Sequence, residues 1–343
     1  QKEISKLEPE LARTQKKLTN DAFLSRAPAD IVAKEKNKLE RLGGKLDKLQ
    51  AQLEKLTKLS GEGSGLLSDE VETLISRALA EDIGSGDITT SCTVSPNAEG
   101  RGRIVAREPL VLAGIDIARQ VFLKVDSGLA ITLAQSDGSR AMEGDKLLEI
   151  IGDLAAMLMA ERTALNFLQR LSGIATLTRA FVDKVVGTSA RILDTRKTTP
   201  GYRLFEKAAV RAGGGYNQRF GLYDGIIIKD NHIAAAGSIQ QAVGAARASN
   251  RHSLRVEVEV ETLDQLAEAI AAGADAIMLD NMDLKTMAEA VRRTGGKVPL
   301  EASGGITLDN VREVAATGVD LISVGALTHS ARAVDMSMEI EPT

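Results

Sequence analysis

Apolar residues recur every three or four positions through the first 58 residues of the chain. The clearest series is the unbroken run Leu39, Leu42, Leu46, Leu49, Leu53 and Leu56. An earlier series begins at Ile4, and a polar stretch ending in Pro28 separates the two. Because a period of about 3.5 residues is typical of paired helices and proline interrupts a helix, the pattern predicts an antiparallel coiled-coil hairpin over residues 1–58.

The pattern changes after a short Ser- and Gly-rich segment at residues 59–65, which predicts a flexible linker. Short β-like runs and helices are mixed over residues 66–172, so an α+β N-terminal domain is expected there. A long helical stretch from about residue 155 to 185 leads out of this domain. Ser172 and Gly173 lie inside that stretch, and we expect them to break or bend the helix.

Strand-like apolar runs alternate with helical stretches over the last part of the chain, residues 173–343. The runs are 192–197, 225–230, 256–260, 276–280, 298–303 and 321–325. Continuous apolar strands that alternate with helices are typical of a parallel sheet covered by helices. Six such units without a glycine-rich dinucleotide fingerprint or a P-loop favour a closed β/α barrel over an open doubly wound sheet. The predicted fold class is therefore α/β.

Charge and cysteine content narrow the functional classes. The chain has a formal net charge of −4, but residues 1–58 carry 14 Lys and Arg against 9 Asp and Glu. The basic excess is confined to that segment. Because the chain as a whole is slightly acidic, it lacks the overall positive charge that drives binding to nucleic acid or membrane surfaces. The single cysteine, Cys92, excludes an internal disulfide and a Cys-type zinc site, which predicts a cytoplasmic protein. No apolar run is long enough to span a bilayer, so no membrane partner is expected.

Polar residues stand at the ends of the predicted barrel strands. They are Arg196, Lys197, Lys229, Glu259, Asp280 and Ser303. Because the carboxyl ends of barrel strands surround the active site, these side chains should converge on one mouth. Arg219 adds a further cation, and Gly304 and Gly325 follow the last two strands with unhindered backbone N–H groups, where barrels habitually bind phosphate.

The two acids of this set, Glu259 and Asp280, are suited to Mg²⁺ that keeps several waters. The expected ligand is a polyanion with phosphates, and carboxylates would suit the arginines. The alternative is a ring of structural ion pairs in which the cations and acids neutralise one another.

Five motifs along the second part of the chain, in order, resemble the quinolinate phosphoribosyltransferase family, the carboxylating nicotinate-nucleotide pyrophosphorylases. The motifs lie at residues 81–90, 161–166, 194–198, 229–232 and 301–306. The resemblance extends over about residues 66–338 and implies an α+β N-terminal domain followed by an irregular parallel β/α barrel. It also implies that quinolinate reacts with 5-phosphoribosyl-1-pyrophosphate and Mg²⁺ to give nicotinate mononucleotide, CO₂ and pyrophosphate, a step of de novo NAD biosynthesis. A homodimer or larger homo-oligomer is implied as well.

The resemblance further implies roles for individual residues. The quinolinate carboxylates would be bound by Arg196, Lys197, Gln218 and Arg219, with Arg162 entering from the neighbouring subunit. Lys229 would hold phosphate or pyrophosphate oxygens, and the 5′-phosphate would be bound by Ser303, Gly304, Gly325 and His329. Glu259 and Asp280 would bind ribose hydroxyls and the metal. The expected catalytic set is Lys197, Lys229, Glu259 and Asp280.

One position departs from the family pattern, because Gln218 stands where the family usually has histidine. A neutral amide can preserve donor geometry but not positive charge. Either turnover is reduced, with altered pH dependence, or a subset of the family tolerates the change. A related phosphoribosyltransferase-like barrel that uses another heteroaromatic acid is the alternative.

Residues 18–23 and 26–28 resemble the C-terminal coiled-coil arm of valyl-tRNA synthetase. That arm contacts the tRNA elbow, and the basic charge of residues 1–58 is compatible with such contact. A solvated hairpin that serves as a fusion or spacer is the preferred interpretation. A third hypothesis for the whole chain is an inactive barrel that this arm carries to tRNA or to another partner.

Overall fold

The computed structural model of the chain describes residues 69–250 and 254–343. The predicted hairpin at 1–58 and linker at 59–65 lie outside the described residues. Residues 1–74 and 75–343 are separate compact units, and the second unit is described here by itself. Within the described residues, no helix is both long and apolar enough to cross a membrane.

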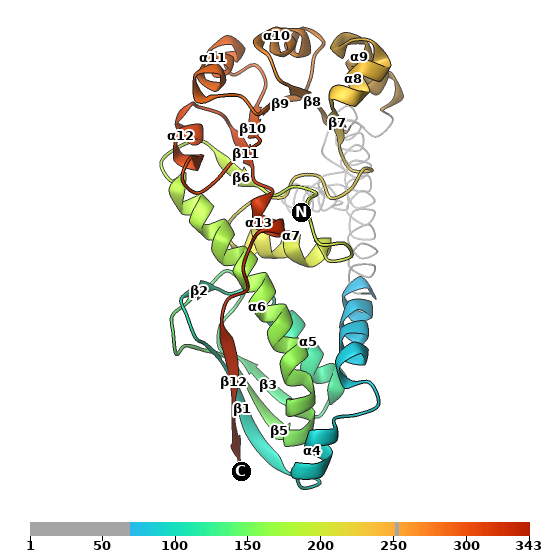
Figure 1. The fold of residues 1–343 in the computed structure, drawn as a ribbon, viewed down its shortest axis with the longest axis vertical. Helices are drawn as coiled ribbons and strands as arrows, with labels where there is room; N and C mark the ends of the chain where they lie inside the picture. Colours follow the sequence, from blue (N-terminus) through green and yellow to red (C-terminus); the bar gives the residue numbers. More distant parts are fainter. Residues whose placement is uncertain (1–68, 251–253) are drawn as a thin grey trace, which may run out of the picture. The chain divides into compact units, whose positions relative to one another are not determined.

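The first part of this unit is an antiparallel sheet backed by helices, as Figure 1 shows. The sheet has the order β12-β1-β5-β3. Its strands are β1 (Glu99–Ala106), β3 (Ala130–Leu133), β5 (Lys146–Asp153) and β12 (Met336–Pro342). A small ribbon pairs β2 (Leu110–Val111) with β4 (Arg140–Ala141). The expected α+β character of this part is confirmed.

Two helices accompany the sheet. Asp87 caps α4 (Ile88–Thr93) by accepting a hydrogen bond from the Thr90 backbone N–H. Helix α5 (Ile115–Val125) buries Ile115, Ala118 and Phe122, and their spacing of three and four residues gives it one apolar face.

Helix α6 (Leu154–Lys184) connects the sheet with the second part and is 31 residues long. The expected break at Ser172 and Gly173 is wrong, because the helix is continuous through both residues. A Cβ atom at position 173 would lie 2.0 Å from the Arg332 carbonyl oxygen. Gly173 therefore allows another segment of backbone to pack against the helix, a requirement that a local pattern does not distinguish from a helix break.

The second part is a six-stranded parallel sheet with the order β6-β11-β10-β9-β8-β7. The strands are β6 (Arg191–Leu193), β7 (Ile226–Ile228), β8 (Val256–Val260), β9 (Ala276–Asp280), β10 (Leu300–Ser303) and β11 (Leu321–Ser323). Its helices are α7 (Arg203–Ala212), α8 (Asp230–Ala236), α9 (Ile239–Ser249), α10 (Leu263–Ala271), α11 (Leu284–Thr294), α12 (Val311–Ala316) and α13 (Ala326–His329). The predicted parallel β/α fold is confirmed.

The prediction of a closed barrel is wrong, because the sheet does not close between its first two strands. The first and last strands pair, since β6 lies beside β11, but β6 and β7 form the two edges of the sheet. The segment between α7 and β7 crosses this opening, and Tyr216 forms a bridge to Leu193 there. The result is the irregular barrel that the family resemblance implies.

The chain ends in the first part rather than in the barrel. Strand β12 pairs antiparallel with β1, for example Gly102 with Ile340. Together with α6, this strand joins the α+β part and the barrel within the one compact unit.

Candidate active site

Four predicted site residues lie near the carboxyl ends of neighbouring strands in the barrel. The register places Asp280 of β9 beside Ser303 of β10, and Glu259 lies near the end of neighbouring β8. Lys229 follows β7, and its Nζ donates to Glu259 Oε2 at 2.5 Å. Because the carboxyl ends of the parallel strands point the same way, these four side chains share the barrel mouth, as predicted.

Glycines shape the other strand ends. Gly304 has a φ of +93°, and a Cβ there would collide with the Asn281 side chain. A Cβ at Gly325 would lie 2.9 Å from Lys197 Cδ and 3.2 Å from His329 Nε2. Lys197 and His329 therefore pack around Gly325, so the loop after β6 contacts the segment after β11.

The two arginines predicted for the site, Arg196 and Arg219, have few partners; Arg219 donates to the Gly225 carbonyl at 2.9 Å, and the nearby acids Asp224 and Glu257 act on it electrostatically. Within the described part of the chain, no ion pair joins an acid to Arg196, Lys197 or Arg219. The pKa of Arg219 is lowered by burial and then by the positive charge of Arg196. The Nε atoms of both arginines are buried without a hydrogen-bond partner among the described residues. Two close, desolvated guanidinium groups of this kind are suited to an anionic ligand.

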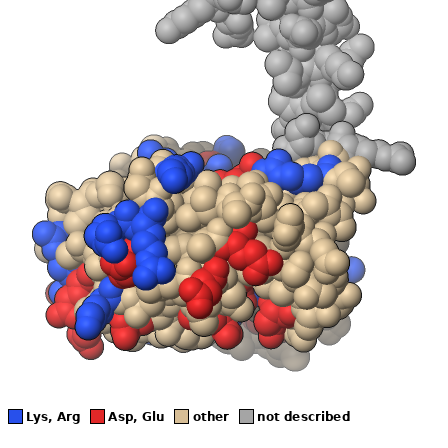
Figure 2. Space-filling model, turned by 90° about the horizontal axis from the view of Figure 1, so that it is seen from above, with Lys and Arg blue, Asp and Glu red and all other residues tan. Residues whose placement is uncertain are grey.

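The alternative of a ring of structural ion pairs accounts for only part of the mouth. Lys229 and Glu259 do form such a pair, with 45% and 14% of their side chains exposed. The arginines remain outside it. On the face shown in Figure 2, a group of basic side chains lies towards the left end, and acidic side chains lie across the middle.

A buried network holds the segment that carries Gln218 and Arg219. Asp194 is fully buried and accepts from Lys207 Nζ at 2.5 Å, from the Gln218 backbone N–H at 2.8 Å and from the Asn217 amide. Burial raises the pKa of Asp194, while the hydrogen bond and charge of Lys207 oppose the rise. Strand β6 thereby fixes the position of a segment more than 20 residues later in the chain.

Arg203 joins the two loops that bear the arginines of the mouth. Its Nε donates to Thr198 Oγ1 at 2.9 Å, and its terminal nitrogens donate to the carbonyl of Phe220 at 2.9 Å and of Arg196 at 3.4 Å. Sequence reasoning missed Arg203, Asp194 and Lys207 as functional residues. A helix of mixed charge such as α7 gives no sign of which side chains will be buried.

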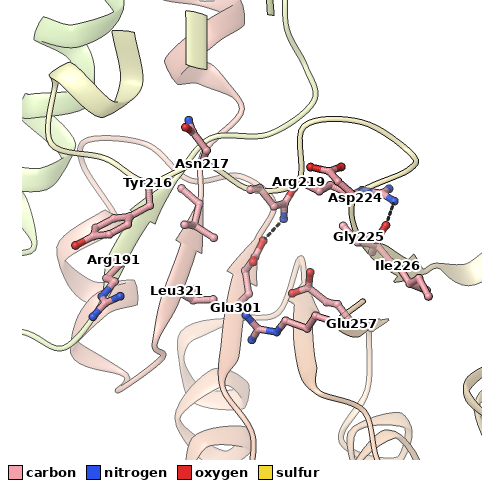
Figure 3. A pocket seen from close by; sticks show the side chains of 14 residues that line it. Arg191, Tyr216, Asn217, Arg219, Asp224, Gly225, Ile226, Glu257, Glu301 and Leu321 are labelled. Atoms are coloured by element: carbon pink, nitrogen blue, oxygen red, sulfur yellow. Dashed lines mark hydrogen bonds between the residues drawn. The ribbon is translucent and has the colours of Figure 1, made fainter. Parts of the chain in front are cut away.

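Gln218 was expected to bind a carboxylate of the substrate, but its side chain contacts a carboxylate of the protein. Its Nε2 donates to Glu301 Oε1 at 2.7 Å, so one amide hydrogen already has a partner inside the barrel. Burial and then the charge of Glu257 raise the pKa of Glu301 to about 8, and burial also raises the pKa of Glu257. Figure 3 shows both carboxylates pointing towards the loop that carries Arg219.

Gln218, Arg219, Glu257 and Glu301 line a cavity of about 300 Å³ inside the barrel, towards the amino ends of its strands. Its walls include Arg191, Arg255 and Leu321 at the amino ends of strands, and Tyr216 from the segment between α7 and β7. Of the predicted site residues it contains only Gln218 and Arg219, and it was not anticipated from the sequence. Barrel interiors are normally packed. Here the cavity lies beside the opening between β6 and β7 (Figure 3).

Two other residues lie apart from this cluster. Arg162 is exposed on α6, and no hydrogen bond or ion pair between described residues links it to the mouth of its own chain. His232 Nδ1 accepts from the Lys229 backbone N–H at 3.0 Å and thus caps α8.

A parallel β/α barrel with cations and glycine-rich strand ends at its mouth belongs to the class of barrel enzymes that act on small anionic substrates. Comparisons with known proteins narrow this class. The profiles of the quinolinate phosphoribosyl transferase C-terminal and N-terminal domains match residues 174–339 and 87–172.

Relatives agree with these profiles. A Bacillus subtilis protein described as a probable nicotinate-nucleotide pyrophosphorylase (carboxylating) is 46% identical over 271 residues, which cover 79% of this chain and 93% of that protein. A Mycobacterium leprae protein of the same description is 45% identical and is covered to 98%. The crystal structure of NadC from Streptococcus pyogenes superposes with a TM-score of 0.78 at 43% identity, covering 80% of this chain and 97% of that one. The chain belongs to the quinolinate phosphoribosyltransferase family.

The resemblance of the N-terminal segment is confirmed separately. The profile of the valyl tRNA synthetase tRNA binding arm matches residues 1–57. Its predicted hairpin structure lies outside the described residues, so that part of the prediction stays untested.

Proposed function

We propose that the chain transfers the phosphoribosyl group of 5-phosphoribosyl-1-pyrophosphate to the ring nitrogen of quinolinate and releases the 2-carboxylate as CO₂. Nicotinate mononucleotide and pyrophosphate are the other products. Membership of the family and the names of its relatives support the reaction. The single observation that carries it is that Arg196 and Arg219 form no ion pair among the described residues, while their Nε atoms are buried without a hydrogen-bond partner there.

A dicarboxylate suits this pair because each guanidinium can donate two parallel hydrogen bonds to one carboxylate. Binding would also relieve the repulsion that lowers the pKa of Arg219. Lys197, at the same loop, would add a third positive charge. These groups would hold quinolinate with its ring nitrogen towards the ribose, and such positioning can supply much of the rate enhancement.

The departure of pyrophosphate leaves positive charge on the ribose and places negative charge on the leaving group. Lys229 would stabilise the leaving oxygens, while Glu259 and Asp280 face the ribose. No protein nucleophile is required, since the pyridine nitrogen attacks directly. In the quinolinate nucleotide the bond from C2 to the carboxylate then breaks, the adjacent cationic ring nitrogen stabilises the electron pair left on C2, and C2 takes up a proton from water to give nicotinate mononucleotide.

The acids of the mouth fit Mg²⁺ as an assisting ion. Glu259 and Asp280 supply carboxylate oxygens from neighbouring strands, and no cluster of three or more metal-ligating side chains occurs in the described ranges. Mg²⁺ is commonly bound by one or two protein carboxylates, and water and substrate oxygens fill its remaining coordination positions. The ion would offset the charge of the pyrophosphate group.

The 5′-phosphate would lie at the ends of β10 and β11. The backbone N–H groups of Gly304 and Gly325 would donate to it, and Ser303 would add a hydroxyl donor. His329 packs against Gly325 and would contribute a further donor. Lys197 borders the same glycine, which brings the phosphate subsite next to the carboxylate subsite.

Arg162 is proposed to complete the quinolinate subsite of a second copy of the chain. Its exposure on α6, away from the mouth of its own chain, supports a role across an interface of a homodimer or larger assembly. A cytoplasmic location, expected from the cysteine content, belongs to the same proposal.

The direct test is to incubate the chain with quinolinate, 5-phosphoribosyl-1-pyrophosphate and Mg²⁺ and to measure nicotinate mononucleotide, CO₂ and pyrophosphate. Equal amounts of the three products are expected. A folded chain that forms none of them contradicts the proposal, and product from another heteroaromatic acid alone identifies the related-barrel alternative. Gln218→His, assayed beside it, shows whether the glutamine lowers turnover.

Sharing of Arg162 is tested by complementation. Arg162→Ala and Arg196→Ala should each be nearly inactive alone, because each lacks one arginine in every site. Mixing them should restore activity, since one mixed site then contains both arginines. Mixed assemblies that stay inactive contradict the sharing of Arg162.

A further inference from the structure

Arg170, on α6, contacts two segments that are far apart in the sequence. Its NH1 donates to the Ala331 carbonyl at 2.7 Å, and its NH2 donates to Glu206 Oε1 at 2.8 Å and to the Thr328 carbonyl. The two carbonyls belong to the segment that follows β11, next to the proposed phosphate subsite. Glu206 belongs to α7, next to the proposed carboxylate subsite.

Glu206 continues this connection. Its side chain is fully buried, and besides Arg170 it accepts from the Thr199 backbone N–H at 3.0 Å and from Thr199 Oγ1 at 2.9 Å. Thr199 lies in the loop after β6 that carries Arg196 and Lys197. One buried carboxylate therefore fixes the loop that would bind the carboxylates of quinolinate.

Thr328 connects the segment after β11 directly with the loop after β6. It is fully buried, and its Oγ1 donates to the Lys197 carbonyl at 2.7 Å. Arg170, Glu206, Thr199, Lys197 and Thr328 thus form a continuous set of contacts that begins and ends on α6. It links the loop after β6 (residues 194–200) with the segment after β11 (residues 325–331).

Such a circuit resists the movement of one segment alone. Displacing the loop would leave the carboxylate of Glu206 with fewer donors in a buried position, and displacing the other segment would leave the guanidinium of Arg170 with fewer acceptors. Buried charges that lose hydrogen-bond partners are costly. Order in one segment consequently favours order in the other.

We propose that Arg170 and Glu206 are positioning residues that couple the two substrate subsites, so that occupation of either one tightens binding at the other. Neither side chain would touch a substrate. The proposal rests on the proposed function for the identity of the ligands, but the coupling itself is a property of the contacts around Glu206. Coupling of this kind is reciprocal and can arise from shared ordering of the protein.

The first test measures binding with two ligands that cannot react together, quinolinate and ribose 5-phosphate, which lacks the leaving group. Calorimetric titrations of the full chain with quinolinate are performed with and without saturating ribose 5-phosphate. Tightening of about fivefold or more is expected in the unaltered chain. In Glu206→Gln the factor should fall to about one while each ligand still binds.

Glu289→Gln is the matched control, because Glu289 also accepts hydrogen bonds from arginine, but on the outer helix α11. It should keep the full coupling factor. A Glu206→Gln chain that retains the factor, or an unaltered chain that shows none, overturns the proposal. A purely structural role would lower stability without changing the ratio of the two affinities.

A second variant and a second measurement cover the case in which Glu206→Gln folds poorly or the ligands are wrong. Thr328→Val keeps the shape of the side chain and removes the hydrogen bond to Lys197. Hydrogen exchange of the ligand-free chain should be faster at both 194–200 and 325–331 in this variant than in Glu289→Gln. Unchanged exchange at either segment overturns the link, whereas failure of the unaltered chain to bind either ligand contradicts the proposed function separately.

Discussion

Charged side chains around the barrel mouth fall into two groups that differ in their surroundings. Behind the mouth, Lys207 and Asp194 form a buried pair, and the partly exposed Arg170 pairs with the buried Glu206. Arg196, in the loop after β6, and Arg219, which lines the cavity, form no ion pair among the described residues, although Asp224 and Glu257 act electrostatically on Arg219. The comparison indicates that the paired charges hold the site loops in place, whereas the arginines without ion pairs are available to bind a ligand. It predicts opposite consequences for substitution in the two groups.

The largest effect on activity is expected at the mouth. Arg196→Ala should lower kcat/KM by about 10³-fold, or about 4 kcal/mol of barrier, because it removes a preorganised charge from the quinolinate subsite. The free energy of unfolding should change little, since no ion pair within the described ranges is lost. Steady-state kinetics and urea unfolding of the same preparation check both parts. Activity within tenfold of the unaltered chain would remove Arg196 from the site.

The buried group should show the reverse. Asp194→Asn should lower the free energy of unfolding by about 3 kcal/mol, because it leaves Lys207 buried without its counter-charge. Urea unfolding measures the loss. A replacement of similar size at an exposed pair, Glu339→Gln beside Arg107, is the control and should be nearly neutral. Equal stability of the two variants would contradict the distinction between the groups.

The acid pair under the mouth predicts a dependence of stability on pH. The folded chain raises the pKa of Glu301 to about 8, chiefly by burial and then by Glu257, from an ordinary value of 4.5. Between these two values the folded state holds a proton that the unfolded state releases, so stability should fall as pH rises from about 4.5 to about 8. At about 1.4 kcal/mol for each pKa unit, a shift of this size corresponds to a loss of about 5 kcal/mol.

Unfolding measured at several pH values checks this prediction. Glu301→Gln carries no titrating group at that position, so its stability should fall less over the same range. A parallel pH profile in both chains would show that Glu301 is not the titrating group.

The fold was predictable to the extent that it follows local periodicity. The alternation of apolar runs with helices indicated a parallel β/α arrangement, and strand ends gave Lys229, Glu259, Asp280 and Ser303 as neighbours, which the register confirms. The opening between β6 and β7 was not predictable, because it depends on which strands pair over long distances.

The residues that hold the site loops in place could not be predicted from local periodicity either, because their burial and hydrogen bonds depend on long-range packing. Glu206 and Lys207 stand on a helix whose sequence resembles a solvated surface, and only packing against α6 and β6 shows them to be buried. Gln218 was recognised as unusual, but its hydrogen bond to Glu301 required knowledge of two segments more than 80 residues apart. The residue types of a mouth can thus be inferred from strand ends, while the network that orients them is a property of the tertiary structure.

The most direct test of the central claim, that the unpaired arginines recognise two carboxylates, is a calorimetric comparison of quinolinate with nicotinate, which has one carboxylate fewer. The account predicts that the unaltered chain binds quinolinate about 100-fold more tightly, and that Arg219→Met removes most of this preference. Equal affinity for the two acids, or a preference that survives Arg219→Met unchanged, would contradict it.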